Sequence, residues 1–342
     1  MEILPKNLGT RPRLAVEVRP EGVVAARAED AQALLAAVAE RSLPEGVLMP
    51  GLKAGNVVDG MRLAAVLREA LDVVAARGGE RTRYVTLVIP DAATRVLLLE
   101  FDEMPAKPAE ALPIVRFRLK KLVPFDPDHA AVSYQVMSAE RGSVQVLVVA
   151  MPSDVLAEYE GAVTAAGYMP GAVLPSTLAT LACLDEQEAP VLVANAGRGG
   201  VTTAIVRRGA LLLHRALELA GDPTDARSLE TLQAAGVVYD RIEAEALIET
   251  QVLEAEAHGS AREVAQSVSV AVAYFEDTLA SVPDGIFSAG TIGADGLQTI
   301  LEENGITALK VREIVGADGL TAGAASRVPR GWLAGVRGAL RN

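Results

Sequence analysis

The stretch "RFRLKKLVPFDPDHAAVSYQV", residues 116–136, joins a basic segment to a strand-like segment through Pro124-Phe125-Asp126. Pro124 ends any helix that precedes it, because proline has no backbone N–H and its ring clashes with the preceding turn. Residues 131–137 have the β-branched and aromatic side chains that are typical of a strand. The junction therefore predicts a helix over residues 109–122, a turn and a strand, and we expect Phe125 to pack where they meet.

Strand and helix patterns alternate on both sides of this junction. Short apolar runs bounded by turn residues predict strands at residues 14–18, 23–27, 83–91, 94–101 and 144–150. Ala- and Leu-rich stretches predict helices at residues 31–40, 60–77 and 153–166. We therefore expect a mixed chain of the α/β or α+β class.

The second half of the chain repeats the theme of the first. Residues 191–219 predict three strands joined by two glycine turns, and residues 228–251 and 261–281 predict helices. The polar stretch "DEQEAP", residues 185–190, separates the halves. Each half thus opens with a β-hairpin meander and continues into helices.

The composition excludes several kinds of function. The chain has 342 residues, half of them hydrophobic, which fits about two globular domains. A net charge of −12 argues against nucleic acid as the main partner, because phosphate binding needs a basic face. The single cysteine, Cys183, fits a reducing cytosol. The three histidines lack a second ligand at metal-site spacing, so we expect no metal site.

Catalytic residues and membrane spans are not expected either. The chain has no nucleophile elbow of the G-x-S-x-G type. Its longest uncharged run, residues 161–184, contains Pro170 and Pro175 and reads as a helix end, a turn and a new helix. The N-terminus lacks the apolar segment that a signal peptide would have.

Two glycine-rich loops are the candidates for a ligand site. Residues 195–200, "NAGRGG", lie between predicted strands, where glycines let backbone N–H groups approach phosphate oxygens closely. Residues 288–296, "SAGTIGADG", follow a strand and begin a helix, and a helix N-terminus favours an anion. The alternative, that both loops are tight turns without a ligand, stays open.

The hairpin layout of both halves, together with the glycine loop before a late helix, resembles the actin-like ATPase fold. Residues 84–184 more specifically resemble the PilM family of type IV pilus assembly proteins. The matching elements are a strand ending in Pro90, a helix running into "PFD", a strand ending in "SYQV" and a helix ending at Ala166-Gly167. The resemblance covers most of residues 10–325.

The resemblance implies an actin-like (ribonuclease H-like) two-domain fold with an inserted small subdomain. Domain I would span residues 10–187 with the insertion at about 84–150, domain II residues 188–326, and a basic tail residues 327–342. The protein would be cytoplasmic and peripheral at the inner membrane. It would bind the N-terminal cytoplasmic peptide of a single-span PilN-type membrane protein and link it to the pilus motor.

The resemblance also implies ATP with Mg²⁺ as a cofactor, but the phosphate hairpins depart from the family's D-x-G pattern. Glu17 and Arg19 stand where the first hairpin would have aspartate and glycine, and the Arg19 side chain fills space that phosphates need. Asn195 stands for the aspartate of the second hairpin, while Gly197 is kept. We expect a degenerate site and at most a very weak ATPase. The residues of this site would be Glu17, Asn195, Gly197, Gly199, Gly200, Thr202, Gly290 and Gly293.

Two interpretations of the junction at residues 116–136 stay open. In the first, a partner peptide binds a basic rim and an apolar contact formed by Arg116, Arg118, Lys120, Lys121, Val123, Pro124 and Phe125. In the second, the aromatic and leucine side chains are core and the cations a solvated face; these apolar residues are Phe117, Leu119, Leu122 and Phe125.

The tail contains Trp332, Val336 and Leu340 at four-residue steps, with arginines around them. This spacing fits a weak anchor on anionic lipid, whereas packing back onto the fold, or fraying, is the interpretation that we favour. We expect membrane contact to be indirect or through this tail.

Two other classes of function fit the same fold. A kinase-type enzyme would need an intact D-x-G hairpin, which "VEVRPEGVV" at residues 16–24 does not supply. The cytoplasmic part of a type II secretion platform protein is the third possibility. Such proteins usually continue into a membrane span, and this chain reaches Asn342 without one.

Overall fold

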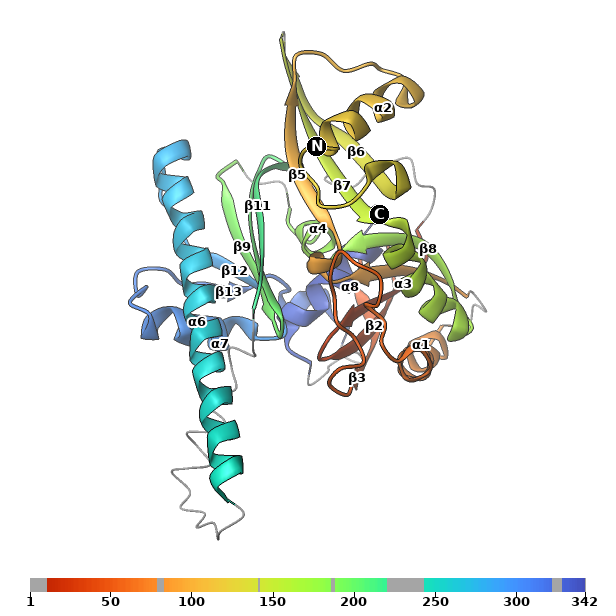
Figure 1. Cartoon of the computed structure of the whole chain (residues 1–342), viewed down its shortest axis with the longest axis vertical. Coiled ribbons are helices and arrows are strands. Elements are labelled where there is room, and N and C mark those ends of the chain that lie inside the picture. Colours follow the sequence, from red (N-terminus) through yellow and green to blue (C-terminus); the bar gives the residue numbers. More distant parts are fainter. Residues whose placement is uncertain are drawn as a thin grey trace.

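The computed structural model describes residues 11–78, 83–140, 142–185, 188–219, 243–321 and 328–341, and for residues 243–258 it describes only the backbone. Residues 228–242 of the predicted helix at 228–251 lie outside this part. Within the described residues, two five-stranded sheets share one strand order, and a smaller sheet of three strands stands apart from them (Figure 1).

The first sheet has the order β3-β2-β1-β4-β8. Its strands are β1 (Leu14–Arg19), β2 (Gly22–Ala28), β3 (Leu35–Ser42), β4 (Tyr84–Ile89) and β8 (Met169–Pro175). The first three form an antiparallel meander, and β4 and β8 add to β1 in parallel. Every residue of β1 and β2 is buried, which explains why both strands read as nearly continuous apolar runs.

The second sheet repeats this topology in the order β11-β10-β9-β12-β13. Its strands are β9 (Val191–Gly197), β10 (Gly200–Arg207), β11 (Ala210–Glu218), β12 (Ile286–Gly290) and β13 (Val311–Glu313). An antiparallel meander again comes first. Strand β12 is added in parallel to β9, and β13 is added in parallel to β12. The β-hairpin meander that the sequence predicted at the start of each half is therefore part of a five-stranded sheet that occurs twice.

The third sheet consists of β5 (Arg95–Phe101), β7 (Ser143–Pro152) and β6 (Ala130–Glu140), all antiparallel. Helix α2 (Pro108–Leu119) covers it and buries Val115 and Leu119 in a core separate from the others. Strand β4 belongs to the first sheet, so this separate unit begins at β5 and not at residue 84, the expected start of the insertion. The η2 turn (Pro127–His129) leads from α2 into β6.

Helices cover the faces of the large sheets. The α1 helix (Gly60–Ala75) buries the predicted face of Leu63, Val66, Leu67, Leu71 and Val74 against the first sheet. The α3 helix (Ser153–Ala165) packs beside it, and α4 (Ser176–Leu181) follows β8. The long α6 (Glu243–Leu279) and α7 (Gly293–Glu303) lie against the second sheet, and α6 projects beyond the body of the molecule (Figure 1).

The predicted helix at residues 31–40 is wrong, because most of this segment forms β3. Its alanines and leucine favour a helix locally. However, Leu35, Ala37 and Ala39 alternate with less buried residues, and pairing with β2 buries this face. Tertiary packing therefore overrides a weak local preference.

The C-terminal segment is not an exposed lipid anchor. The η5 turn (Arg330–Trp332) and α8 (Leu333–Leu340) are inserted between the two large sheets. Trp332 is only 4% exposed, and Leu333, Val336 and Leu340 are fully buried. The predicted spacing is real, but the face that it creates packs back onto the fold and is not available to lipid. Among the described residues, none of the helices combines the length and apolar character that a membrane span requires.

Two glycines let α8 approach its neighbours closely. A Cβ at Gly338 would lie 1.8 Å from the carbonyl oxygen of Ala179 in α4, and a Cβ at Gly335 would lie 2.3 Å from Oε2 of Glu17. Neither position has room for a side chain. The glycines that lower the helical propensity of this segment are therefore what allows it to be buried.

Replacing Gly338 by alanine tests this packing. Helix propensity alone would stabilise the protein by about 1 kcal/mol, but the clash with a backbone carbonyl should reverse the sign and cost about 1–3 kcal/mol. The matched control is Gly161→Ala in α3, where a Cβ would meet nothing within 4 Å. Urea unfolding should show a lower midpoint for Gly338→Ala and an unchanged or higher midpoint for Gly161→Ala. Equal gains in both variants would contradict the packing of α8.

Candidate functional site

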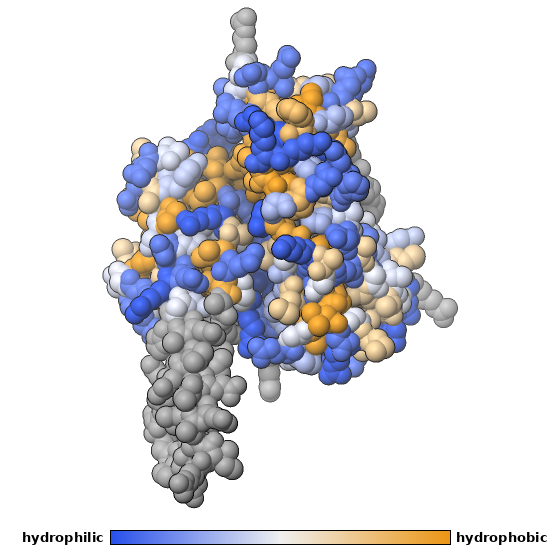
Figure 2. Space-filling view, viewed as in Figure 1, coloured by the Kyte–Doolittle hydropathy of each residue, from blue (hydrophilic) through white to orange (hydrophobic). Residues whose placement is uncertain are grey.

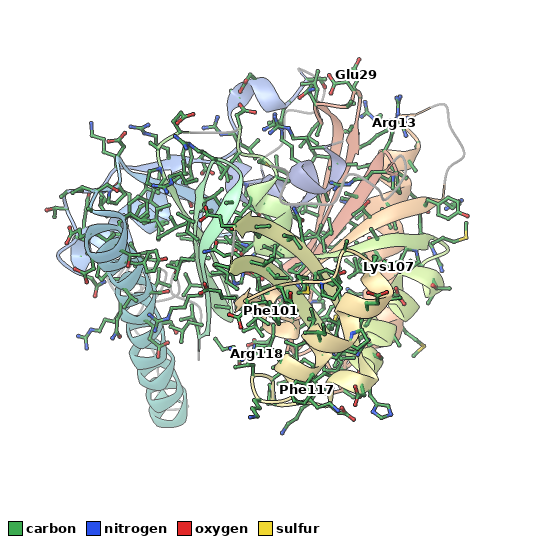
Figure 3. All side chains as sticks on the ribbon, turned by 90° about the horizontal axis from the view of Figure 1, so that it is seen from above. Arg13, Glu29, Phe101, Lys107, Phe117 and Arg118 are labelled. Atoms are coloured by element: carbon green, nitrogen blue, oxygen red, sulfur yellow. The ribbon has the colours of Figure 1, made fainter. Side chains whose placement is uncertain are left out.

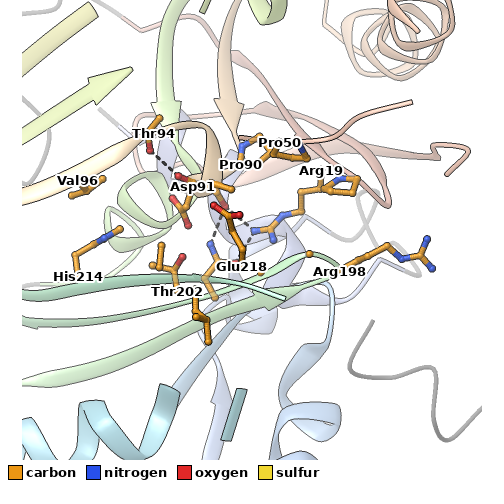
Figure 4. A pocket seen from close by; sticks show the side chains of 18 of the residues that line it. Arg19, Pro50, Pro90, Asp91, Thr94, Val96, Arg198, Thr202, His214 and Glu218 are labelled. Atoms are coloured by element: carbon orange, nitrogen blue, oxygen red, sulfur yellow. Dashed lines mark hydrogen bonds between the residues drawn. The ribbon is translucent and has the colours of Figure 1, made fainter. Parts of the chain in front are cut away.

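Arg19 reaches from the end of β1 into the cleft between the two large sheets (Figure 4). Its Nε donates to Oε1 of Glu17 at 2.8 Å, and its Nη2 donates to Oγ of Ser176 and to Oδ1 of Asn195, both at 2.7 Å. Ser176 begins α4, and Asn195 lies on β9 of the second sheet. One guanidinium thus connects both sheets and the first turn of a helix.

A chain of hydrogen bonds extends this cluster towards Asp91. The amide nitrogen of Asn195 donates to the hydroxyls of Ser176 and Thr177, both at 2.9 Å. Ser176 in turn donates to Oε1 of Glu17 at 2.6 Å. Thr177 donates to Asp91 through both its backbone N–H and its hydroxyl. Each hydroxyl therefore donates once and accepts at least once, and the network is chemically consistent.

Glu21, two residues after Arg19 in the hairpin turn, forms a second connection between the sheets. Its Oε1 accepts from the backbone N–H of Arg198 at 2.6 Å and from the hydroxyl of Thr291 at 2.7 Å. A Cβ at Gly197 would lie 2.5 Å from that Glu21 oxygen and 2.6 Å from Oγ1 of Thr291. The glycine that the phosphate-loop pattern singled out therefore makes room for a carboxylate of the chain itself.

The cluster is a buried ion pair. Glu17 is 0% exposed, and burial raises the pKa of Glu17, although the charge of Arg19 and the hydrogen bonds from Ser176 and Arg19 oppose this rise. Burial lowers the pKa of Arg19, but the carboxylates of Glu17, Glu21 and Asp91 outweigh it, so the pKa is raised above its ordinary value. Arg19 is therefore a permanent cation in the cleft, and Glu17 depends on it for charge compensation.

A cavity of about 330 Å³ lies beside this cluster. Its lining includes Arg19, Ser176, Asn195, Asp91, Thr202 and His214. Figure 4 shows Arg19 at one end of the cavity and His214 at the other. Nε2 of His214 is buried and has no hydrogen-bond partner among the described residues. Burial lowers the pKa of His214, against the opposing charge of Asp91, so this imidazole is neutral near pH 7.

The structure gathers most of the predicted nucleotide-site residues around the cleft. Glu17 and Asn195 belong to the cluster around Arg19, and Gly197 adjoins it. A Cβ at Gly290 would lie 2.8 Å from Oδ1 of Asn195. Three further residues of the predicted site, Gly199, Gly200 and Thr202, line the cavity beside this cluster. Gly293 is the exception, since its nearest side-chain neighbours are Glu313 and Pro329.

The sequence analysis missed four members of the site. Asp91 lies at the end of the strand predicted at residues 83–91, and Ser176 lies in the uncharged run at residues 161–184, and neither was assigned to the site. Thr177 and Thr291 were not singled out at all. The available signal was a polar residue directly after β8 and β12, and one residue further on after β4, at the strand ends where parallel sheets position ligand-binding side chains.

The junction at residues 116–136 uses much of its predicted binding surface internally. Arg116 donates to the carbonyl oxygens of Pro127 and Ala130, and Lys120 pairs with Asp128 at 2.7 Å. Val123 and Phe125 are half-buried against the core of the third sheet. The core interpretation is therefore confirmed for Leu119 and wrong for Phe117 and Leu122, which are 73% and 46% exposed. Peptide binding stays a prediction.

Exposed apolar and charged side chains alternate on the outer face of α2. Figure 3 shows Phe117 and Arg118 at the outer edge of the molecule. Ile114 and Leu122 are also exposed, as are Lys121 and Pro124. In Figure 2 the end of the molecule that carries α2 is a mixture of hydrophilic and hydrophobic residues. Among the described residues, no group of histidine, cysteine and carboxylate side chains is arranged to hold a metal ion.

Replacing His214 by asparagine tests whether the fold keeps this imidazole neutral. In the unfolded chain this histidine binds a proton near pH 6.5, whereas in the folded protein it does so only at lower pH. The free energy of unfolding of the wild type should therefore fall as the pH drops below about 6.5, by at most about 1.4 kcal/mol per pH unit. The His214→Asn variant has no imidazole to protonate at this position, so it should not show this loss of stability. Urea unfolding at about pH 7.5 and about pH 5.5 measures the difference.

The matched control for this experiment is His129→Asn, since the His129 side chain is 86% exposed. This variant should lose stability on acidification as the wild type does. An equal loss in His214→Asn would show that His214 is not held neutral by the fold.

Comparison with known proteins agrees with this architecture. No protein-family model matches the chain, and no curated protein matches it. A chain of a PilM-PilN type IV pilus biogenesis complex is 21% identical, with a TM-score of 0.73 over 96% of this chain and 98% of that chain. The ethanolamine utilization protein EutJ from Carboxydothermus hydrogenoformans is 13% identical, with a TM-score of 0.53 over 99% and 91%.

The cytoplasmic domain of EpsL, from the type II secretion system of Vibrio cholerae, is more distant. It is 14% identical over 67% of this chain and 77% of that domain, and its TM-score of 0.38 is too low to support a conclusion. The resemblance that residues 84–184 suggested is thus confirmed at the level of the fold. The chain has the actin-like ATPase fold, in the form seen in the PilM-PilN complex.

Proposed function

We propose that the protein is a scaffold of the inner-membrane assembly platform of a type IV pilus, and that it works without a nucleotide-driven switch. The likeness to the PilM-PilN complex supports the first part. The observation that carries the second is Arg19, whose side chain occupies the cleft between the two hairpins that would hold phosphates.

The charges of the cleft oppose ATP. A phosphate placed between the hairpins would meet the carboxylates of Glu17 and Glu21, and like charges at short range are repelled strongly where water is excluded. The backbone N–H of Arg198, which would be free to bind phosphate in a nucleotide loop, already donates to Glu21. A kinase-type enzyme, the alternative, would need this cleft to open and to exchange its charges. We therefore propose a pseudo-ATPase.

Its partner, in this proposal, is the N-terminal cytoplasmic peptide of a PilN-type single-span membrane protein. The protein would then be cytoplasmic and peripheral at the inner membrane, and it would link this peptide to the motor. Because the C-terminal helix is buried, contact with the membrane is indirect. We retain the division into domain I at residues 10–187 and domain II at residues 188–326 as part of the proposal, with the small subdomain beginning at β5.

We place the peptide contact on the outer face of α2 and the turn that follows it. Arg116, Lys120, Val123 and Phe125 hold the junction together, so their part is to shape the surface. Lys121 and Pro124 are exposed, and Phe117 lies one helical turn before Lys121. An exposed aromatic ring beside a cation is a frequent anchor in protein interfaces.

Titration of Mg-ATP into the purified protein tests the pseudo-ATPase. We expect no saturable heat at millimolar ATP, with or without the metal, because Arg19 and Glu21 occupy the phosphate positions. The same nucleotide solution, titrated into an ATP-binding actin-like protein, serves as the control. Micromolar binding would show that the cleft opens to nucleotide and would overturn this part of the proposal.

Binding of a fluorescent peptide tests the partner site. The probe is a synthetic peptide with the cytoplasmic N-terminal sequence of the PilN-type protein encoded in the same genome. Phe117→Ala should weaken binding about tenfold, or about 1.4 kcal/mol, because the exposed ring is lost without disturbing the core. Met61→Ala, which removes an 88% exposed side chain from α1, is the matched control. If both variants bind as wild type does, the α2 surface is not the contact.

A further inference from the structure

We propose that the cleft between the two large sheets is a guanidinium-binding site whose resident ligand is the chain's own Arg19. In this proposal the tethered cation takes the place of an external ligand in holding the sheets together. The inference rests on the cleft alone and does not depend on a role in pilus assembly, so each of the two can fail without the other.

The acceptors around Arg19 match a planar guanidinium. A carboxylate oxygen of Glu17, a hydroxyl oxygen of Ser176 and an amide oxygen of Asn195 receive its N–H groups at 2.7–2.8 Å. They come from three elements that are far apart in sequence, β1, α4 and β9. Guanidinium groups offer several N–H donors in a fixed plane, which an ammonium group cannot reproduce.

The site also has the charge of a cation receptor. Besides Glu17, the carboxylates of Glu21 and Asp91 act on Arg19 and raise its pKa. Oε2 of Glu17 is buried and has no hydrogen-bond partner among the described residues. Without Arg19, the cleft would therefore contain a fully buried carboxylate with no cation beside it, which is strongly unfavourable.

One hairpin contributes two of the polar connections between the two halves of the chain. Arg19 binds Asn195 of β9, and Glu21 binds Thr291 and the backbone of Arg198, all in the second half of the chain. Arg19 and Glu21 flank a single residue, Pro20, so the turn presents a cation and an anion to the facing sheet. The closed arrangement of the cleft is therefore built into the chain.

Chemical rescue of Arg19→Ala tests the proposal. We expect the thermal midpoint of this variant to lie several degrees below that of the wild type. Millimolar guanidinium chloride should raise the thermal midpoint in a saturable way, because the free ion binds the empty site of the folded protein and not the unfolded chain. In the wild type, guanidinium should only lower the midpoint, as a denaturant does.

Three controls separate site binding from general effects. Urea is a neutral molecule of nearly the same shape, and tetramethylammonium is a cation without N–H donors, so neither should rescue Arg19→Ala. Arg95→Ala removes another arginine that lines the cavity, and guanidinium should not raise its midpoint. Rescue by urea or tetramethylammonium, or rescue of Arg95→Ala to the same extent, would overturn the proposal.

A second variant keeps the test decisive if Arg19→Ala does not fold. Arg19→Lys retains the charge but lacks the planar set of donors, and we expect a midpoint below that of the wild type and no rise with guanidinium. A midpoint equal to that of the wild type would show that the cleft requires only a charge and would overturn the assignment of a guanidinium site. For a soluble Arg19→Ala variant, the absence of any rescue would do the same.

Discussion

The ion pair between Arg19 and Glu17 is the constraint on which the rest of the cleft depends. A carboxylate that is entirely removed from water must have a cation and hydrogen-bond donors close to it, and Arg19 and Ser176 provide them. Because Arg19 also binds Asn195, the cation that compensates the charge of Glu17 is itself held by the opposite sheet. A buried pair of this kind adds little net stability compared with apolar packing, but removing either partner is costly. The ion pair therefore serves mainly to specify one arrangement of the two sheets and adds little to the free energy of unfolding.

The same cleft is closed from a third side by the C-terminal helix. Residues of both sheets and of α8 form one hydrophobic cluster, in which Trp332 is the largest side chain. The backbone of α8 lies against Glu17 at Gly335 and against α4 at Gly338. The polar cluster is thus enclosed by apolar packing, and this enclosure keeps water away from the ion pair and strengthens its electrostatic interaction.

Sequence patterns predicted the structure correctly where residues close together in the chain determine it. The two hairpins, the apolar face of α1 and the turn between α2 and β6 could be predicted because turn chemistry and periodicity act over a few residues, although α2 ends at Leu119 and not at residue 122. Residues 31–40 were mispredicted because β2 buries a face that propensity cannot see. The space-filling role of Arg19 was predicted, but its partner Ser176 was not, because 157 positions separate the two residues and no local pattern joins them. The tail's apolar spacing was read correctly, yet the sequence left open whether lipid or protein would cover it.

The identical strand order of the two large sheets makes their first hairpins topologically equivalent. In the register of the first hairpin Arg19 faces Gly22, and in that of the second Gly197 faces Gly200, so Arg19 and Gly197 are counterparts, as are Glu17 and Asn195. Nη1 of Arg19 lies 3.3 Å from where a Cβ of Gly197 would be. Two arginines at these positions would collide, and two glycines would leave a hole. The cleft is filled because the two equivalent positions differ in opposite ways: one hairpin has a long side chain there and the other has none.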